Sequence, residues 1–189
     1  MRLFQFTLLL VCSFSNAQTY DSNLKFRLVY LETDSIDKIE IIGKIESFYK
    51  LTIEQDLSIT RSEGNSFEVS QFVKAVQDTL SSESDYFYLF FTNKPIYIGQ
   101  KDFTLRGFAS KRTAIVSTFK IKSQSKTAAE YERILLKTFL HETGHLLGLM
   151  HCTNSEKCFM VTSFPESLFL NSQNLLCDSC INIIKIHIR

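Results

Sequence analysis

The chain has 189 residues, of which 44% are apolar and 13% aromatic, enough to build one domain around a single packed core. Its 21 Lys and Arg residues nearly balance its 20 Asp and Glu residues, so no global field attracts nucleic acid or an anionic membrane, and neither is an expected partner. With two prolines, six glycines and no internal repeat, the chain is expected to be compact throughout.

Residues 1–17 have the pattern of a secretory signal peptide. A positively charged second residue precedes an apolar run at 3–11, and Ser15 and Ala17 are small residues where signal peptidase would cleave. The run is about half of the roughly 20 residues that a spanning helix needs, so no membrane span is expected. We predict cleavage after Ala17 and a secreted or periplasmic protein. The alternatives are a buried first strand, or a lipoprotein anchored through Cys12, which the bulky residue before it disfavours.

The mature chain, residues 18–189, begins with the pattern of a β-α-β unit. Residues 24–31 and 51–60 alternate apolar and polar side chains, which predicts two strands with one buried face each. Residues 34–50 between them carry isoleucines at near-helical spacing, and Asp34 is a residue type favoured at a helix N-cap.

The alternation of helix and strand continues through the middle of the chain. Ser66 is expected to cap a second helix, and residues 86–92 are expected to form an aromatic strand. Shorter extended pieces are predicted at 96–99, 104–109 and 113–121. Thr127 and Glu130 form a capping box that opens a helix reaching about Leu147. The expected fold class is α/β, a compact single domain with a mixed β-sheet and flanking helices.

No long periodic segment follows Gly148, so a small loop-rich C-terminal subdomain is expected, which needs a metal or disulfides to hold its shape. All four cysteines of the mature chain lie there, at Cys152, Cys158, Cys177 and Cys180. A loose pair followed by a Cys-x-x-Cys pair matches a closed tetrahedral zinc site. Export to an oxidising compartment would instead favour disulfides, and the residues leave both alternatives open.

A segment that begins at His141 reads His-Glu-Thr-Gly-His-Leu-Leu-Gly-Leu-Met-His. Histidines four residues apart on a helix share one face, so His141 and His145 can bind one metal ion. Gly148 can end the helix in a left-handed conformation and let the chain turn back, so that His151 becomes the third ligand. Glu142 is then placed to act as general base toward a metal-activated water. This pattern predicts a zinc-dependent hydrolase of peptide bonds.

Three histidines of this kind followed by a methionine turn are the mark of metzincins, and Met160 fits that methionine. With the cysteines included, the array resembles the archaemetzincin family, whose pattern continues as Cys-x4-Cys-x-Met-x17-Cys-x-x-Cys. Here the two gaps are five and sixteen residues, so Cys152 and Cys177 keep the family's separation. Residues 107–110 and 114–118 also resemble the strands that precede the active-site helix in that family.

The resemblance implies a metzincin-like domain with one catalytic zinc and a second, structural zinc within the segment 152–180. It also implies a peptidase that acts, aminopeptidase-like, on short peptides. Two Zn²⁺ per chain, a peptide or protein substrate and a monomeric state are therefore expected. The alternative function is a catalytically weak or inactive zinc-binding homologue, although the chain keeps Glu142 and every expected ligand.

Metzincins bind an extended peptide along an edge strand above the helix that carries the metal ligands. We predict that residues 104–110 form this edge, because they precede the strand expected at 113–121. Gly107 is the candidate substrate-binding position, since a missing side chain lets another backbone come close. The alternative is that Gly107 serves a turn or a bulge.

Overall fold

A computed structural model describes residues 24–31, 38–56, 65–80, 85–99, 104–156, 158–162 and 176–187. The predicted signal peptide at 1–17, with Cys12 and Ala17, lies outside these residues, and so does the predicted helix cap Asp34. Among the described residues, no helix is both long and apolar enough to cross a membrane.

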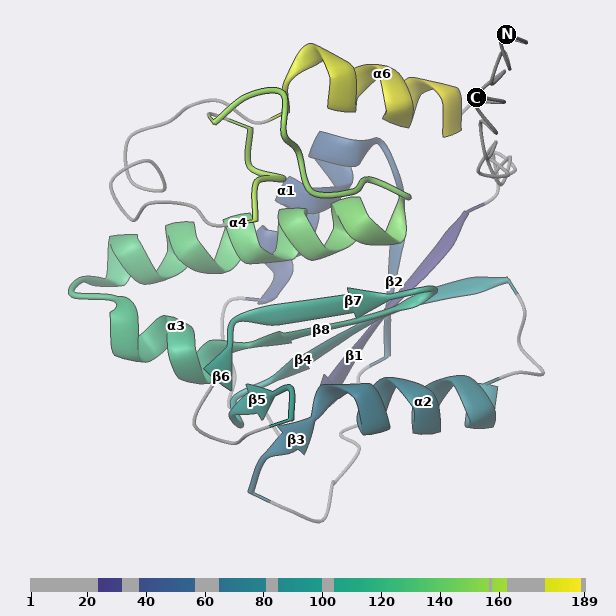
Figure 1. Ribbon diagram of the computed structural model, residues 1–189. Coiled ribbons are helices and arrows are strands. Elements are labelled where there is room, and N and C mark those ends of the chain that lie inside the picture. The colour runs from purple at the N-terminus through teal and green to yellow at the C-terminus, as the bar shows by residue number, and fades with distance from the viewer. Residues whose placement is uncertain are drawn as a thin grey trace, which may run out of the picture.

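A five-stranded sheet in the order β2-β1-β4-β8-β7 forms the centre of the fold (Figure 1). Its strands in chain order are β1 (Lys25–Leu31), β2 (Ile53–Asp56), β4 (Tyr86–Thr92), β7 (Gly107–Ser110) and β8 (Thr113–Ser117). Neighbouring strands pair in parallel except β7, which pairs antiparallel with β8. The predicted mixed sheet is confirmed, and β7 lies at its edge.

Helices cover both faces of this sheet (Figure 1). The helices α1 (Lys38–Tyr49) and α4 (Ala128–Leu146) pack on one face, and α2 (Val69–Leu80) packs on the other. Successive residues of β1 supply opposite cores: Leu28 packs with the α1 and α4 side, and Val29 packs with the α2 side. The central parallel strands are therefore buried on both faces, as such strands usually are.

The remaining elements are short. A second sheet has the order β3-β5-β6, formed by β3 (Phe67–Glu68), β5 (Ile96–Tyr97) and β6 (Thr104–Leu105). The helices α3 (Thr118–Gln124) and α6 (Asp178–His187) complete the described chain. Thr127 caps α4 as predicted, because its side chain accepts a hydrogen bond from the backbone N–H of Glu130. The Glu130 carboxylate accepts from the N–H of Lys126 at 2.7 Å, and not from that of Thr127 as in a standard capping box.

Two predicted boundaries are wrong. The helix expected after Ser66 begins at Val69, because Phe67 first pairs with Ile96 in the small sheet. The extended piece expected at 113–121 ends at Ser117, whose side chain accepts a hydrogen bond from the N–H of Phe119 and caps α3. In both places a side chain or a distant strand decides the boundary, which the apolar pattern does not show.

The C-terminal segment, predicted to be loop-rich with no long periodic segment, also contains one helix that the sequence did not predict, α6 at Asp178–His187. This helix begins inside the Cys-x-x-Cys pair and carries Cys180 in its first turn. Asp178 stands at its N-terminus, where a negative charge is favourable for the helix dipole. The rest of the described C-terminal segment, 147–156 and 158–162, contains no regular helix or strand, so the loop-rich prediction holds there.

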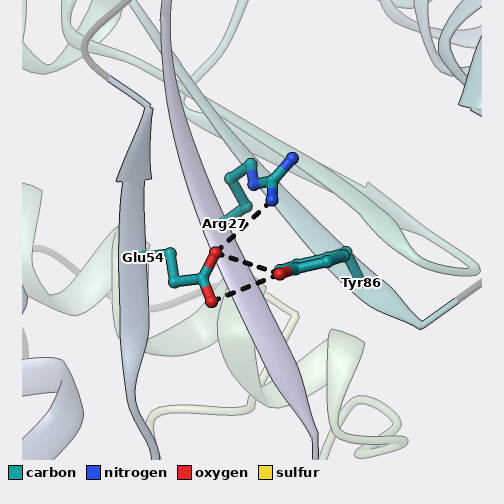
Figure 2. Close-up of polar contacts among 3 residues, drawn as sticks. All are labelled: Arg27, Glu54 and Tyr86. Atoms are coloured by element: carbon teal, nitrogen blue, oxygen red, sulfur yellow. Dashed lines mark hydrogen bonds and ion pairs between the residues drawn. The ribbon is translucent and has the colours of Figure 1, made fainter. Parts of the chain in front are cut away.

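A polar group joins β1, β2 and β4 on the β2 side of the sheet, opposite the β7 edge (Figure 2). The Glu54 carboxylate on β2 accepts hydrogen bonds from the Tyr86 hydroxyl at 3.1 and 3.2 Å and from Arg27 at 3.4 Å. The Arg27 guanidinium lies 4.1 Å from the centre of the Tyr86 ring. Because the group is largely exposed, we assign it a modest structural role.

Candidate metal centres

Three histidines converge at the C-terminal end of α4. His141 and His145 lie one turn apart on the helix, and Gly148 ends it with a positive φ of 87°, the left-handed conformation that the sequence predicted. The chain then returns through Leu149, which places His151 beside the other two rings. Ligand atoms of the three histidines lie within 4.8 Å of one another. The predicted three-histidine cluster is therefore assembled in the structure.

Backbone carbonyls hold two of the three rings. The Nδ1 atom of His141 lies 2.7 Å from the Phe159 carbonyl oxygen, and that of His145 lies 2.7 Å from the Leu149 carbonyl oxygen. A carbonyl oxygen can only accept, so each Nδ1 carries the hydrogen and each Nε2 keeps its lone pair. Burial also lowers the pKa of His141 to about 4, with the Phe159 carbonyl acting in the opposite direction. Both rings are thus neutral and aim a free lone pair at the same point, as metal ligands do.

The separation of these lone pairs fits a metal ion. The Nε2 atoms of His141 and His145 are 3.0 Å apart, although neither can donate a hydrogen bond to the other. Two lone pairs this close repel each other unless a cation lies between them. Tetrahedral zinc with Zn–N bonds of about 2.0–2.1 Å places its nitrogen ligands about 3.4 Å apart, close to the observed arrangement.

Glu142 lies beside the histidines on the wall of a cleft of about 660 Å³. Its side chain is only 6% exposed. Burial raises the pKa of Glu142 to about 8, and the positive charge of Arg106 acts in the opposite direction. A carboxylate in this state binds a proton more readily than an exposed one, which suits a group that must accept and release a proton.

The cleft runs between α4 on one side and β7 on the other. Residues 105–111 line the β7 side, while Thr138 and the three histidines line the α4 side. Met150, which is 80% exposed, and Val161 complete the lining. Of the edge predicted at 104–110, only β7 (Gly107–Ser110) forms the edge strand of the large sheet beside the cleft, because Thr104 and Leu105 pair with β5 in the small sheet.

Met160 lies beneath the histidines, where the sequence placed the methionine turn. It is fully buried, and its carbonyl oxygen accepts a hydrogen bond from the N–H of Cys152 at 2.8 Å. A Cβ atom added to Gly144 would be 2.7 Å from the Met160 sulfur and 3.0 Å from the Tyr49 hydroxyl. The glycine between the two helical histidines therefore makes room for the methionine.

The four cysteines form a second cluster. The Sγ atoms of Cys152 and Cys177 are 3.5 Å apart, and those of Cys158 and Cys180 are 3.8 Å apart. All four sulfurs lie within 4.8 Å of one another, and all four cysteines are free. Tetrahedral zinc with Zn–S bonds of about 2.3 Å places its sulfurs about 3.8 Å apart. This geometry fits the zinc alternative rather than the disulfide alternative.

The sequence did not predict several contacts of the site. The Tyr49 hydroxyl on α1 donates a hydrogen bond of 2.6 Å to the carbonyl of Leu140, the residue before the first histidine. Arg106, between β6 and β7, lines the cleft near Glu142. The carbonyls that orient the rings belong to Phe159 and Leu149, two apolar residues. Residue type and spacing do not predict contacts of this kind. The one signal in the sequence is Arg106 itself, a charged residue beside the predicted edge strand.

Comparisons with known proteins agree with this geometry. A model of Peptidase family M54 matches residues 73–186. The chain is 36% identical over 74 residues to an archaemetzincin of Aeropyrum pernix, an alignment that covers 39% of this chain and 40% of that protein. It is 38% identical over 71 residues to an archaemetzincin of Nanoarchaeum equitans, covering 36% and 35%. The chain thus aligns with less than half the length of these curated relatives.

Solved structures show the same fold. An archaemetzincin from Methanopyrus kandleri aligns with a TM-score of 0.65 at 20% identity, covering 87% of this chain and 94% of that one. An archaemetzincin from Archaeoglobus fulgidus, solved in complex with malonate, gives 0.63 at 21% identity, covering 84% and 99%. A zinc-dependent peptidase from Methanocorpusculum labreanum gives 0.61 at 15% identity, covering 84% and 99%.

Proposed function

The chain belongs to peptidase family M54, and from that membership we propose that it is a zinc-dependent peptidase with Glu142 as its general base. The observation that carries the proposal is that two histidine rings on the α4 side of the cleft are held in fixed orientations. His141 and His145 present bare Nε2 atoms 3.0 Å apart, next to a buried carboxylate in the same cleft. His151 completes the set of three nitrogen ligands.

The chemistry divides between the metal and the chain. Zinc, when bound by the three histidines, supplies a Lewis acid that polarises the scissile carbonyl and lowers the pKa of a water molecule. Glu142 accepts the proton of the attacking water and later donates it to the leaving amine. The carbonyls of Phe159 and Leu149 keep the two helical rings in the orientation and tautomer that ligation requires.

The substrate proposed for this cleft is an extended peptide. Among the residues that the structure describes, only β8 pairs with β7, so the other edge of β7 offers backbone groups to a second chain. A peptide that pairs with this edge would place a scissile bond above the histidines. An aminopeptidase-like preference for short peptides belongs to the same proposal and follows from the resemblance to archaemetzincins.

A second zinc is proposed for Cys152, Cys158, Cys177 and Cys180. The support is the sulfur geometry, with separations of 3.5 and 3.8 Å between paired atoms. Such a closed site leaves no position for a substrate or water, so its role is to hold the C-terminal segment in shape. The proposal is thus two zinc ions per chain with different tasks.

The experiment is incubation of the zinc-loaded protein with a diverse peptide mixture, with products identified by mass spectrometry. A Glu142→Gln protein carried through the same preparation serves as the control for contaminating peptidases. Products that appear with the wild-type chain and not with the control would support the proposal. A ladder of products shortened from the amino end would support aminopeptidase-like action, whereas internal fragments would indicate endopeptidase action. Identical product lists from both proteins would contradict a peptidase function.

A further inference from the structure

Gly107 lies directly against the side chain of Glu142. A Cβ atom built onto Gly107 would be 2.5 Å from Glu142 Oε1, 2.7 Å from Cγ and 2.8 Å from Cδ. Carbon atoms in favourable contact are about 3.5–4.0 Å apart, so the shortfall is about 1 Å at three atoms of one side chain. The space that an alanine would fill at position 107 is therefore already occupied by the carboxylate group.

The backbone conformation does not explain the glycine. Among the described glycines, only Gly99 and Gly148 have a positive φ. Gly107 lies in regular strand β7 and pairs with Val116 of β8, so its conformation is open to any residue. The chain bends at Arg106, directly before β7, but Gly107 itself needs no left-handed conformation, so the close packing against Glu142 is the reason that the structure offers for the missing side chain.

The backbone is held in place on both sides of this contact, so the Glu142 side chain is the part that must yield. The strand is held from one side by β8, whose Val116 is fully buried. Glu142 is carried by α4, which packs directly over β7 (Figure 1). Thr143, the next residue of the helix, is fully buried, and Glu142 itself is 6% exposed. A side chain at position 107 would consequently push the carboxylate out of its place on the cleft wall.

We infer that Gly107 is a positioning residue: its missing side chain makes the room in which the Glu142 carboxylate is held toward the histidines. The inference rests on the proposed function, in which Glu142 is the general base. Proton transfer requires a base within about 2.6–3.2 Å of the proton's donor. A misplacement of about 1 Å can reduce the rate about 10²-fold. Gly107 therefore acts on the reaction through the base, in addition to any pairing of β7 with a peptide.

The first test is kinetic. Gly107→Ala is expected to lower kcat by about 10–100-fold, with KM and zinc content close to those of the wild type. Gly43→Ala is the matched control, because a Cβ at Gly43 meets nothing within 4 Å. That variant should keep the wild-type kcat. A Gly107→Ala protein with wild-type kcat would overturn the inference, and so would a loss confined to KM, which would return Gly107 to a substrate-pairing role.

The second test needs no activity and remains informative if Gly107→Ala folds poorly. In the full-length chain that is otherwise wild-type, Gly107→Ala should lower the melting temperature by several degrees. In a Glu142→Ala background the three crowding atoms are gone, so the same substitution should lower it by much less. Equal shifts in both backgrounds would show that another contact is responsible, and would overturn the inference. An inactive wild-type protein that nevertheless shows unequal shifts would contradict the proposed function and leave the contact with Glu142 established.

Discussion

Replacing Glu142 with Gln tests the proposed base with little disturbance of the structure. Gln has the shape of Glu and can occupy the same room above Gly107, but its amide cannot accept the proton of the attacking water. Glu142 belongs to neither cluster of ligand atoms, so both zinc ions should be retained. The variant therefore separates loss of the proton acceptor from loss of the metal.

The magnitude follows from the isolation of this carboxylate in the cleft. Among the described residues that line the cleft, Glu142 is the only Asp or Glu, so no neighbour can take over its task. General base catalysis contributes about 10²–10⁴-fold to a rate. We expect kcat to fall by this factor, which corresponds to about 2.8–5.6 kcal/mol of transition-state stabilisation at 1.4 kcal/mol per tenfold.

The assay measures initial rates of cleavage for a peptide found to be a substrate, together with zinc content by atomic absorption. Glu132→Gln is the matched control, because Glu132 is an exposed carboxylate on the same helix. It should keep the wild-type rate. A Glu142→Gln protein that keeps two zinc ions and a kcat within a few-fold of the wild type would refute the assignment of the base.

Three further predictions concern the metals and the packing beneath them. The purified chain should contain two zinc ions, and a chelator should first remove the one required for activity; one zinc and no free thiol after denaturation would instead establish disulfides. Gly144→Ala should reduce the free energy of unfolding by about 1–3 kcal/mol in denaturant titrations, because its Cβ would crowd Met160. Gly43→Ala should cause no such loss, and equal stability of both variants would contradict the crowding. Cys158→Ser should weaken zinc binding at the histidines about 10–100-fold in competition titrations, because it would shift the neighbouring Phe159 carbonyl, which orients the His141 ring. An unchanged affinity would show that the two centres are independent.

The two side-chain clusters could be predicted from the sequence because their geometry is local. Two histidines four residues apart must share a helix face, and Gly148 supplies the reversal that His151 needs, as its φ of 87° shows. The cysteine cluster could also be proposed from spacing, since a loose pair followed by a Cys-x-x-Cys pair matches a closed zinc site. These features depend on a few neighbouring residues, so they can be predicted without knowledge of the rest of the fold.

The contacts that position the site could not be predicted in the same way. Gly107 and Glu142 are distant in the chain and meet only because α4 packs over β7. Tyr49 reaches the helix from α1, across the core. In the sequence, nothing distinguishes Gly107 from any other glycine near a strand. The sequence therefore predicts a role in pairing with a substrate and does not show the contact with Glu142. The tertiary packing supplies a different reason for the same residue.

The histidine cluster and two of the four cysteines, Cys152 and Cys158, lie in one continuous segment, residues 141–160. Cys158 contributes its sulfur to the cysteine cluster, Phe159 contributes the carbonyl that fixes the His141 ring, and Met160 fills the space beneath Gly144. The Met160 carbonyl in turn accepts a hydrogen bond from Cys152, the residue after the third histidine. A metal at the cysteines would hold this segment in the one arrangement that keeps the His141 tautomer correct. We therefore propose that the cysteine segment acts on the histidine cluster through the Phe159 carbonyl, which orients the His141 ring.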